Sequence, residues 1–137
     1  MRRGDVYDVA LNPLRGSEQT GLRPVVVVSR DAINAASSVV IVVPCTTHRE
    51  GRRVYPTQAR IEVPEGGLEV DSLALGEQAW AVSKDRLGRR RGRLSPETLS
   101  TLDRALLIAL DLPALARRRY PSSSCRLFGP CTTRHNR

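Results

Sequence analysis

The sequence predicts a mainly β fold, in which a small curled antiparallel sheet is followed by one C-terminal helix. Residues 25–28 and 39–43 are continuous apolar runs, typical of strands that are buried on both faces. Only ten residues join the two runs, too few for the crossover helix that parallel strands need. The run Ser95-Pro96-Glu97 supplies a capping serine, a proline at the first helical position and an acid in the first turn, which marks a helix start.

Further strands are expected around this central pair. Each is a short run with apolar positions, bounded by turn residues. They cover residues 5–11, 58–63, 70–82 and 86–94. Gly76 divides the third of these into two short strands or bends it. Asn12-Pro13 is expected to end the first strand, and Pro44 to end the second apolar run.

Two segments are expected to be helical. Residues 29–38 can form one or two turns, capped by Ser29 or Asp31. The C-terminal helix is expected to end at Pro113. Its predicted apolar face consists of Leu99, Leu102, Leu106 and Leu110.

The length of 137 residues suits one domain with a sizeable core. The net charge is +8, but residues 113–137 contain six arginines and no acids, which leaves 16 basic and 14 acidic residues, or +2, for residues 1–112. We expect residues 1–112 to form the folded domain and residues 113–137 to be a disordered Arg/Ser/Pro-rich tail. The tail supplies most of the basicity, so the high pI is weak support for nucleic-acid binding by the domain.

No apolar run is long enough to span a membrane, and the first residues lack the apolar segment of a signal peptide. We therefore expect a cytoplasmic protein with no membrane association. Three cysteines, Cys45, Cys125 and Cys131, are an odd number in a chain without an export signal, which disfavours a disulfide framework. Cys125, Cys131 and His135 are too irregularly spaced to predict a zinc site, and no metal or cofactor is expected.

Arg23 lies where a polar loop bounded by glycines leads into the first apolar strand. Pro24 removes a backbone donor and favours an extended chain just before it. Antiparallel pairing of the two apolar strands would bring Arg23 and Thr46 together at one edge of the sheet. A planar guanidinium on a stiff strand can bind a phosphate with two hydrogen bonds. The alternative is an arginine that is solvated or paired with Glu18.

Several stretches of the chain resemble the MazF/PemK-type toxin endoribonucleases of bacterial type II toxin–antitoxin systems. The matching stretches are residues 2–13, 15–29, 39–47, 71–78, 84–99 and 102–112, in the family's order and at similar spacing. The resemblance implies an SH3-like antiparallel β-barrel of the CcdB/PemK-like type with a C-terminal helix, and a homodimer. It also implies a MazE-like antitoxin whose extended acidic segment blocks the RNA groove, with contact to DNA only through that antitoxin.

The resemblance implies metal-independent cleavage of single-stranded RNA at short sequences, leaving a 2′,3′-cyclic phosphate and a 5′-hydroxyl. The family's catalytic arginine and threonine match Arg23 and Thr46. Ser17, Glu18 and Gln19 match a loop that covers the substrate, and Gln78 matches a position close to the site. Thr47 and the basic pair Arg52-Arg53 complete the residues expected to contact RNA.

The chemistry fits these residue types. The RNA's own 2′-hydroxyl would attack, so the protein must align the attack and stabilise charge on the phosphate. Arg23 suits charge stabilisation, and Thr46 can donate to a non-bridging oxygen or orient the 2′-hydroxyl. Arginine is a poor general base, so Glu18 and His48 are the candidates for proton transfer. In the alternative interpretation, His48 is a solvated histidine of a loop.

Other features have competing interpretations. Cys45 is better explained as filling an apolar slot than as a nucleophile. The cluster Arg89-Arg90-Arg91 suits an RNA backbone or is a solvated face. Trp80 can stack on a base or belong to a core or an interface. Where the family commonly has Gln-Ile-Arg-Thr, this chain has Gln78-Ala79-Trp80-Ala81, which bears on RNA sequence preference.

Two function classes follow. The first is a toxin ribonuclease, favoured by Arg23 with Thr46. The second is a non-enzymatic CcdB-like toxin that uses the same fold to bind a protein target such as DNA gyrase.

Overall fold

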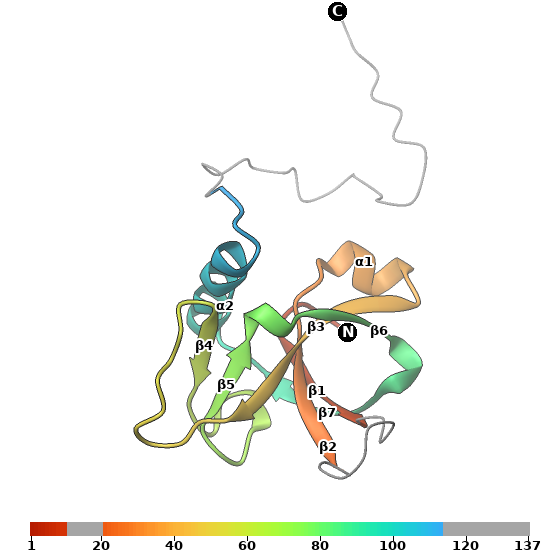
Figure 1. The fold of residues 1–137 in the computed structure, drawn as a ribbon. Helices are drawn as coiled ribbons and strands as arrows, with labels where there is room; N and C mark the ends of the chain where they lie inside the picture. The colour runs from red at the N-terminus through yellow and green to blue at the C-terminus, as the bar shows by residue number, and fades with distance from the viewer. Residues whose placement is uncertain (11–20, 114–137) are drawn as a thin grey trace, which may run out of the picture.

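The computed structural model describes residues 1–10 and 21–113, which form a curled antiparallel sheet with a long helix beside it (Figure 1). The strands are β1 (Asp5–Ala10), β2 (Leu22–Val27), β3 (Val39–Thr47), β4 (Gln58–Ile61), β5 (Ser72–Leu75), β6 (Trp80–Ser83) and β7 (Leu87–Arg93). The helices are α1 (Asp31–Ala36) and α2 (Pro96–Ala109), and the 3-10 turns are η1 (Glu65–Gly67), η2 (Gly76–Gln78) and η3 (Lys84–Arg86). The predicted mainly β fold with a C-terminal helix is confirmed.

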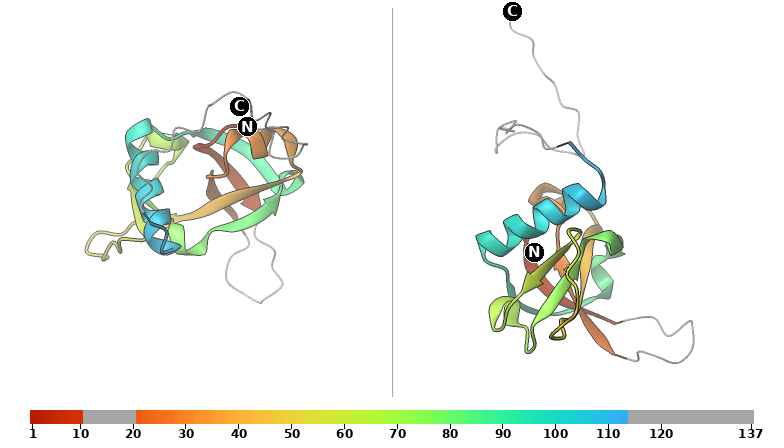
Figure 2. Two further views of the ribbon diagram at one scale, coloured as in Figure 1. Left: turned by 90° about the horizontal axis from the view of Figure 1, so that it is seen from above. Right: turned by 60° about the vertical axis from the view of Figure 1, so that its left-hand side comes forward.

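The strands follow the order β4-β5-β3-β2-β1-β7, and β6 pairs with the first half of β3. All of these pairings are antiparallel, so the predicted pairing of the two apolar strands is confirmed. Residues 70–82 form two short strands, β5 and β6, with η2 at Gly76 between them. Seen from above, the strands curve around a common interior and α2 lies along one side (Figure 2).

The central strands contribute to two separate apolar clusters because alternate side chains leave a strand on opposite faces. On β2, Val26 belongs to a first cluster that includes Leu102 and Ala105 of α2. Val25 and Val27 belong to a second cluster on the other face. All three valines are fully buried, and each stabilises the fold by roughly 1.5 kcal/mol or more. Burial of this strand on both faces, as predicted, is therefore confirmed.

The prediction that Pro44 ends the second apolar strand is wrong. β3 continues through Pro44 to Thr47, and Pro44 is paired with Val25 of β2. On its other edge β3 pairs with β6 up to Val42 and with β5 from Cys45 onward. Pro44 therefore lies where β3 exchanges one neighbour for another, and its missing N–H falls at an interruption of that ladder.

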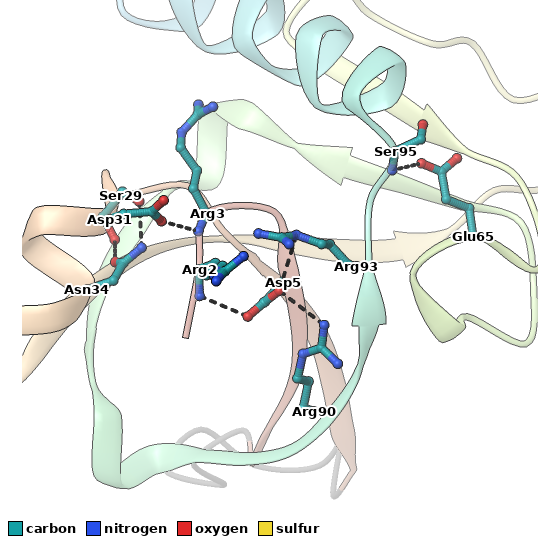
Figure 3. A network of polar contacts seen from close by, with 10 residues as sticks. All are labelled: Arg2, Arg3, Asp5, Ser29, Asp31, Asn34, Glu65, Arg90, Arg93 and Ser95. Carbon is teal, nitrogen blue, oxygen red and sulfur yellow. Dashed lines mark hydrogen bonds and ion pairs between the residues drawn. The ribbon is translucent and has the colours of Figure 1, made fainter. Parts of the chain in front are cut away.

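The predicted cap of α1 is also wrong. Arg30 is the N-cap residue, and no side chain caps the helix. The hydroxyl of Ser29 donates instead to the amide oxygen of buried Asn34, and the amide nitrogen of Asn34 donates to the backbone oxygen of Ser29 at 2.8 Å. The carboxylate of Asp31 accepts a hydrogen bond from the backbone N–H of Arg3 at 2.7 Å. Both predicted caps thus bind other partners (Figure 3).

The start of α2 was predicted correctly, but its end was not. The Ser95 hydroxyl accepts a hydrogen bond from the backbone N–H of Thr98, and Pro96 is the first helical residue. The helix ends at Ala109, four residues before Pro113. Leu110 follows as the C-cap with 61% of its surface exposed, because it lies beyond the turns of α2 that pack on the sheet.

Two buried carboxylates join β1 to β7. Asp5 lies 3.3 Å from Arg90 and 3.6 Å from Arg93, and Asp8 forms an ion pair with Arg91. Both aspartates are at most 5% exposed. Figure 3 shows Asp5 between its two arginines, with the backbone N–H of Arg2 as a further donor at 2.9 Å. Three of the four arginines of β7 therefore neutralise buried acids, which corrects the interpretation of this basic run as a merely solvated face.

Replacing Asp8 by Asn should destabilise the fold by about 2 kcal/mol, because Arg91 would lose the carboxylate that neutralises it in a largely buried setting. Urea unfolding of the two proteins measures the difference. The matched control is Asp85→Asn on the exposed turn η3, which should change the free energy of unfolding by less than about 0.5 kcal/mol. Equal effects of the two substitutions would contradict the assigned role of Asp8.

Glu65 on η1 is hydrogen-bonded to the first turn of α2. Its carboxylate accepts hydrogen bonds from the backbone N–H of Ser95 at 2.6 Å and from the Thr98 hydroxyl at 2.8 Å (Figure 3 shows the first). Partial burial works against ionisation, but the hydrogen bonds from Ser95 and Thr98 outweigh it and hold the pKa of Glu65 below its ordinary value of 4.5. The ionised form is thus favoured by folding.

Because its pKa is lowered in the folded state, Glu65 contributes stability that is present above about pH 4.5 and is lost as the pH falls through the lowered pKa. We expect Glu65→Gln to be less stable than the parent by about 1 kcal/mol at pH 7, the usual size of a helix-cap effect. This difference should shrink below pH 4.5 in thermal or urea unfolding. Glu69→Gln, at an exposed site, is the control. A Glu65→Gln deficit that stays constant with pH would refute the assignment.

Candidate active site

The antiparallel pairing of β2 with β3 stops two residues short of Arg23 and Thr46. The paired residues are Val25 with Pro44, Val26 with Val43 and Val27 with Val42. Continued by two residues, this register would set Arg23 opposite Thr46, and both are half-buried. A second observation agrees, since the positive charge of Arg23 acts on the thiol of Cys45, the neighbour of Thr46.

Both side chains belong to the same face of the sheet. Side chains two residues apart on a strand share a face, so Arg23 goes with Val25 and Thr46 with Val42, which are both in the second cluster. Thr47 then leaves β3 on the opposite face and is exposed. The alternation of side chains thus assigns Arg23 and Thr46 to one face of the sheet and Thr47 to the other.

Cys45 is enclosed in the first cluster and is 1% exposed. Burial raises the pKa of its thiol to about 12, and the charge of Arg23 offsets this only in part. A thiol that stays protonated at neutral pH is a poor nucleophile. The interpretation of Cys45 as an apolar filler is confirmed. Cys125 and Cys131 lie outside the described residues.

His48 is half-buried in the loop that follows β3. Its backbone N–H donates to the backbone oxygen of Asp71 at 2.8 Å. Its ring nitrogen Nδ1 is buried and has no hydrogen-bond partner within the described part of the chain. A histidine that acts as a general base is ordinarily held through its second nitrogen by an acceptor. His48 lacks this support, and Glu18, the other candidate for proton transfer, lies outside the described residues together with Ser17 and Gln19.

The remaining predicted contact residues are spread along the sheet. Arg52 and Arg53 are exposed in the loop that follows His48, and the guanidinium of Arg53 lies 5.3 Å from the centre of the Tyr55 ring. Gln78 ends η2, which lies beside β3 between the residues that pair with β5 and with β6. Gln78 is exposed at the end of this turn. Trp80 packs against the second cluster, consistent with a core role.

A cavity of about 580 Å³, which no sequence pattern predicted, opens beside the end of β3. His48, Glu50, Gly51, Arg60 and Asp71 line it. These residues come from the β3–β4 loop, β4 and the residue before β5, so no local motif joins them.

Across residues 1–10 and 21–113, no group of three His, Cys, Asp or Glu side chains is arranged to hold a metal ion. Neither is any helix of this part long and apolar enough to span a membrane.

Comparison with known proteins identifies relatives. The family described as PemK-like, MazF-like toxin of type II toxin-antitoxin system matches residues 2–110. Endoribonuclease MazF9 of Mycobacterium tuberculosis is 43% identical over 117 residues, which cover 82% of this chain and 98% of that protein. An endoribonuclease in complex with its cognate antitoxin from a mycobacterial species is 28% identical, with a TM-score of 0.67 over 82% of this chain and 97% of that one. A MazE-MazF structure from Deinococcus radiodurans shares the fold at 20% identity, with a TM-score of 0.67 over 82% of this chain and 97% of that one.

The buried thiol yields a chemical test. At pH 8 we expect iodoacetamide to leave Cys45 unmodified in the folded protein, because almost none of it is thiolate and the sulfur is enclosed. Peptide mass spectrometry measures the labelling, and the same protein unfolded in guanidinium chloride is the control. Rapid labelling of Cys45 in the folded state would contradict this placement.

Proposed function

The chain belongs to the PemK-like, MazF-like toxins of type II toxin–antitoxin systems and is an endoribonuclease, and we propose that it cleaves single-stranded RNA at short specific sequences without a metal ion. The reaction would leave a 2′,3′-cyclic phosphate and a 5′-hydroxyl. The observation that supports this proposal is the register of the β2–β3 pair, whose continuation by two residues would set Arg23 opposite Thr46 on one face of the sheet.

In the proposed mechanism the 2′-hydroxyl of the RNA attacks the adjacent phosphorus, and the bond to the 5′-oxygen of the next nucleotide breaks. Negative charge grows on the non-bridging oxygens, which the guanidinium of Arg23 stabilises with two hydrogen bonds. The hydroxyl of Thr46 donates to a non-bridging oxygen or orients the attacking group. Glu18 is the preferred acceptor of the 2′-hydroxyl proton, because His48 lacks a supporting partner on Nδ1 within the described residues. DNA has no 2′-hydroxyl and should not be cut.

An antitoxin neutralises this activity. The mycobacterial relative of known structure is in complex with its cognate antitoxin, and MazE-MazF structures share the fold. We propose that the antitoxin of this chain is MazE-like, that its extended acidic segment covers the RNA groove, and that it supplies any contact with DNA. We also propose that the toxin is a homodimer and acts in the cytoplasm, where its substrate is found. The relatives named as endoribonucleases favour RNA cleavage over the CcdB-like alternative of gyrase binding.

The test is cleavage of a mixed-sequence single-stranded RNA in EDTA, with both new ends mapped. Arg23→Ala and Thr46→Ala should each lower the cleavage rate at least about 100-fold, as expected when a donor to the transition state is removed. The controls are Arg104→Ala and Thr101→Ala, both at exposed positions of α2.

Recurrent cuts with cyclic-phosphate ends that disappear in both site variants would establish the pair. No cutting by folded wild-type protein would refute the proposal. Cutting that persists in both site variants would assign the chemistry to other residues.

A further inference from the structure

The cavity lined by His48, Glu50, Gly51, Arg60 and Asp71, which we call the His48 cavity, lies next to the proposed active site. Thr46 pairs with Leu73 of β5, and Leu73 pairs with Arg60 of β4. His48 directly follows β3, and its backbone N–H donates to the backbone oxygen of Asp71, the residue before β5. The cavity therefore lies beside the end of β3 that carries Thr46. Its volume of about 580 Å³ is typical of a small-ligand site.

One wall of the cavity is a fixed, charged carboxylate. Asp71 accepts hydrogen bonds from the backbone N–H of Val63 at 2.9 Å and from Arg60 at 3.5 Å. The Val63 hydrogen bond is the main cause that keeps the pKa of Asp71 below its ordinary value of 3.8. Arg60 lies also 3.8 Å from Glu62, so two acids offset its positive charge.

Glu50 supplies a second carboxylate at the mouth. It lies in a turn closed by a hydrogen bond from the Arg52 N–H to the Arg49 oxygen at 3.0 Å. Gly51 takes the third position of this turn with φ of +81°, a conformation that side-chain-bearing residues rarely adopt. No ion pair or hydrogen bond engages the Glu50 carboxylate within the described ranges. The turn thus fixes the backbone of Glu50, whose exposed side chain is available to a ligand.

The charges decide which part of an RNA fits. Two acids line the cavity, and the one arginine there is already offset, so a phosphate would be repelled. Arg49 and Arg52 are exposed on the turn outside, where they can contact phosphates. A neutral base rich in hydrogen-bond donors suits the interior. Guanine presents N1–H and N2–H₂ side by side to a carboxylate and accepts at O6 from an arginine.

We propose that the His48 cavity binds a guanine base of the RNA that flanks the cut, with Glu50 accepting from its N1–H and N2–H₂ and Arg60 donating to its O6. The flat ring of His48 forms the wall on which the base stacks, in place of a role in proton transfer. This inference rests on the proposed ribonuclease function and names a base that the enzyme selects.

Binding can be measured without cleavage, using 2′-O-methyl pentanucleotides that cannot attack their own phosphate. The probes are UUXUU with X as guanine, adenine, cytosine, uracil or hypoxanthine, the last being guanine without its N2 amino group. Fluorescence anisotropy at one salt concentration gives the affinities for the full-length protein. We expect the guanine probe to bind about tenfold tighter than the hypoxanthine probe, a typical effect of one specific base contact.

Glu50→Gln should bring the two affinities within about twofold, because it removes the charged acceptor. The matched control is Glu62→Gln, an exposed acid near Arg60 that does not line the cavity, and it should retain the tenfold difference. Both substitutions are at exposed positions, and thermal unfolding checks that both proteins fold. If the Glu50→Gln protein prefers the guanine probe over the hypoxanthine probe as strongly as the parent does, the inference is overturned. Equal binding of all five probes by the parent would also overturn it. The acids of the cavity would then be assigned to binding a basic side chain of a protein partner.

The same preparations are tested on unmodified RNA, which separates the two proposals. Base discrimination without cleavage would refute the ribonuclease proposal and leave the cavity assignment standing as a binding site. Cleavage at sites without a flanking guanine would refute the cavity assignment alone. Cleavage next to guanine that loses this preference in Glu50→Gln, but not in Glu62→Gln, supports both.

Discussion

The register between β2 and β3 is the constraint on which the rest of the structure depends. Val25 and Val27 face one apolar cluster and Val26 faces the other, so a slip by one residue would exchange the side chains between two differently shaped interiors. Fully buried valines on both faces make such a slip costly. Continued to the end of β3, the same register would set Arg23 opposite Thr46. The packing of the core and the geometry of the proposed reaction would then have one cause.

Charge is the second constraint, and it changes the meaning of the basic composition. Asp5 and Asp8 are buried residues of β1, and arginines of β7 neutralise them. Much of this basic run therefore stabilises the fold. Around the His48 cavity, acids offset the local arginine as well. Residues 1–112 carry a net charge of only +2. Non-specific attraction to nucleic acids depends mainly on phosphate contacts, which so small a net charge supports weakly.

Sequence patterns predicted elements well where a local rule had no competitor. Ser95 caps α2 as expected, since its hydroxyl has the nearby Thr98 N–H as a partner. They failed where distant residues supplied better partners or a special environment. Ser29 binds Asn34 instead of capping α1, and Pro44 is accommodated within β3 because the neighbouring strand changes there. For the site, the order and type of the strands were enough to predict that Arg23 lies near β3. They did not predict which side chains are buried.

The sequence by itself determined the strand-rich architecture, the C-terminal helix, the family and the antiparallel pairing of the two apolar strands, because each follows from local patterns and a short connection. The tertiary structure alone decided the burial of His48 and the cavity beside it. That cavity combines the β3–β4 loop with β4 and the residue before β5, segments brought together by the pairing of β5 with both β3 and β4. Burial, enclosure and charge balance are properties of all neighbours in space, and one-dimensional spacing does not contain them.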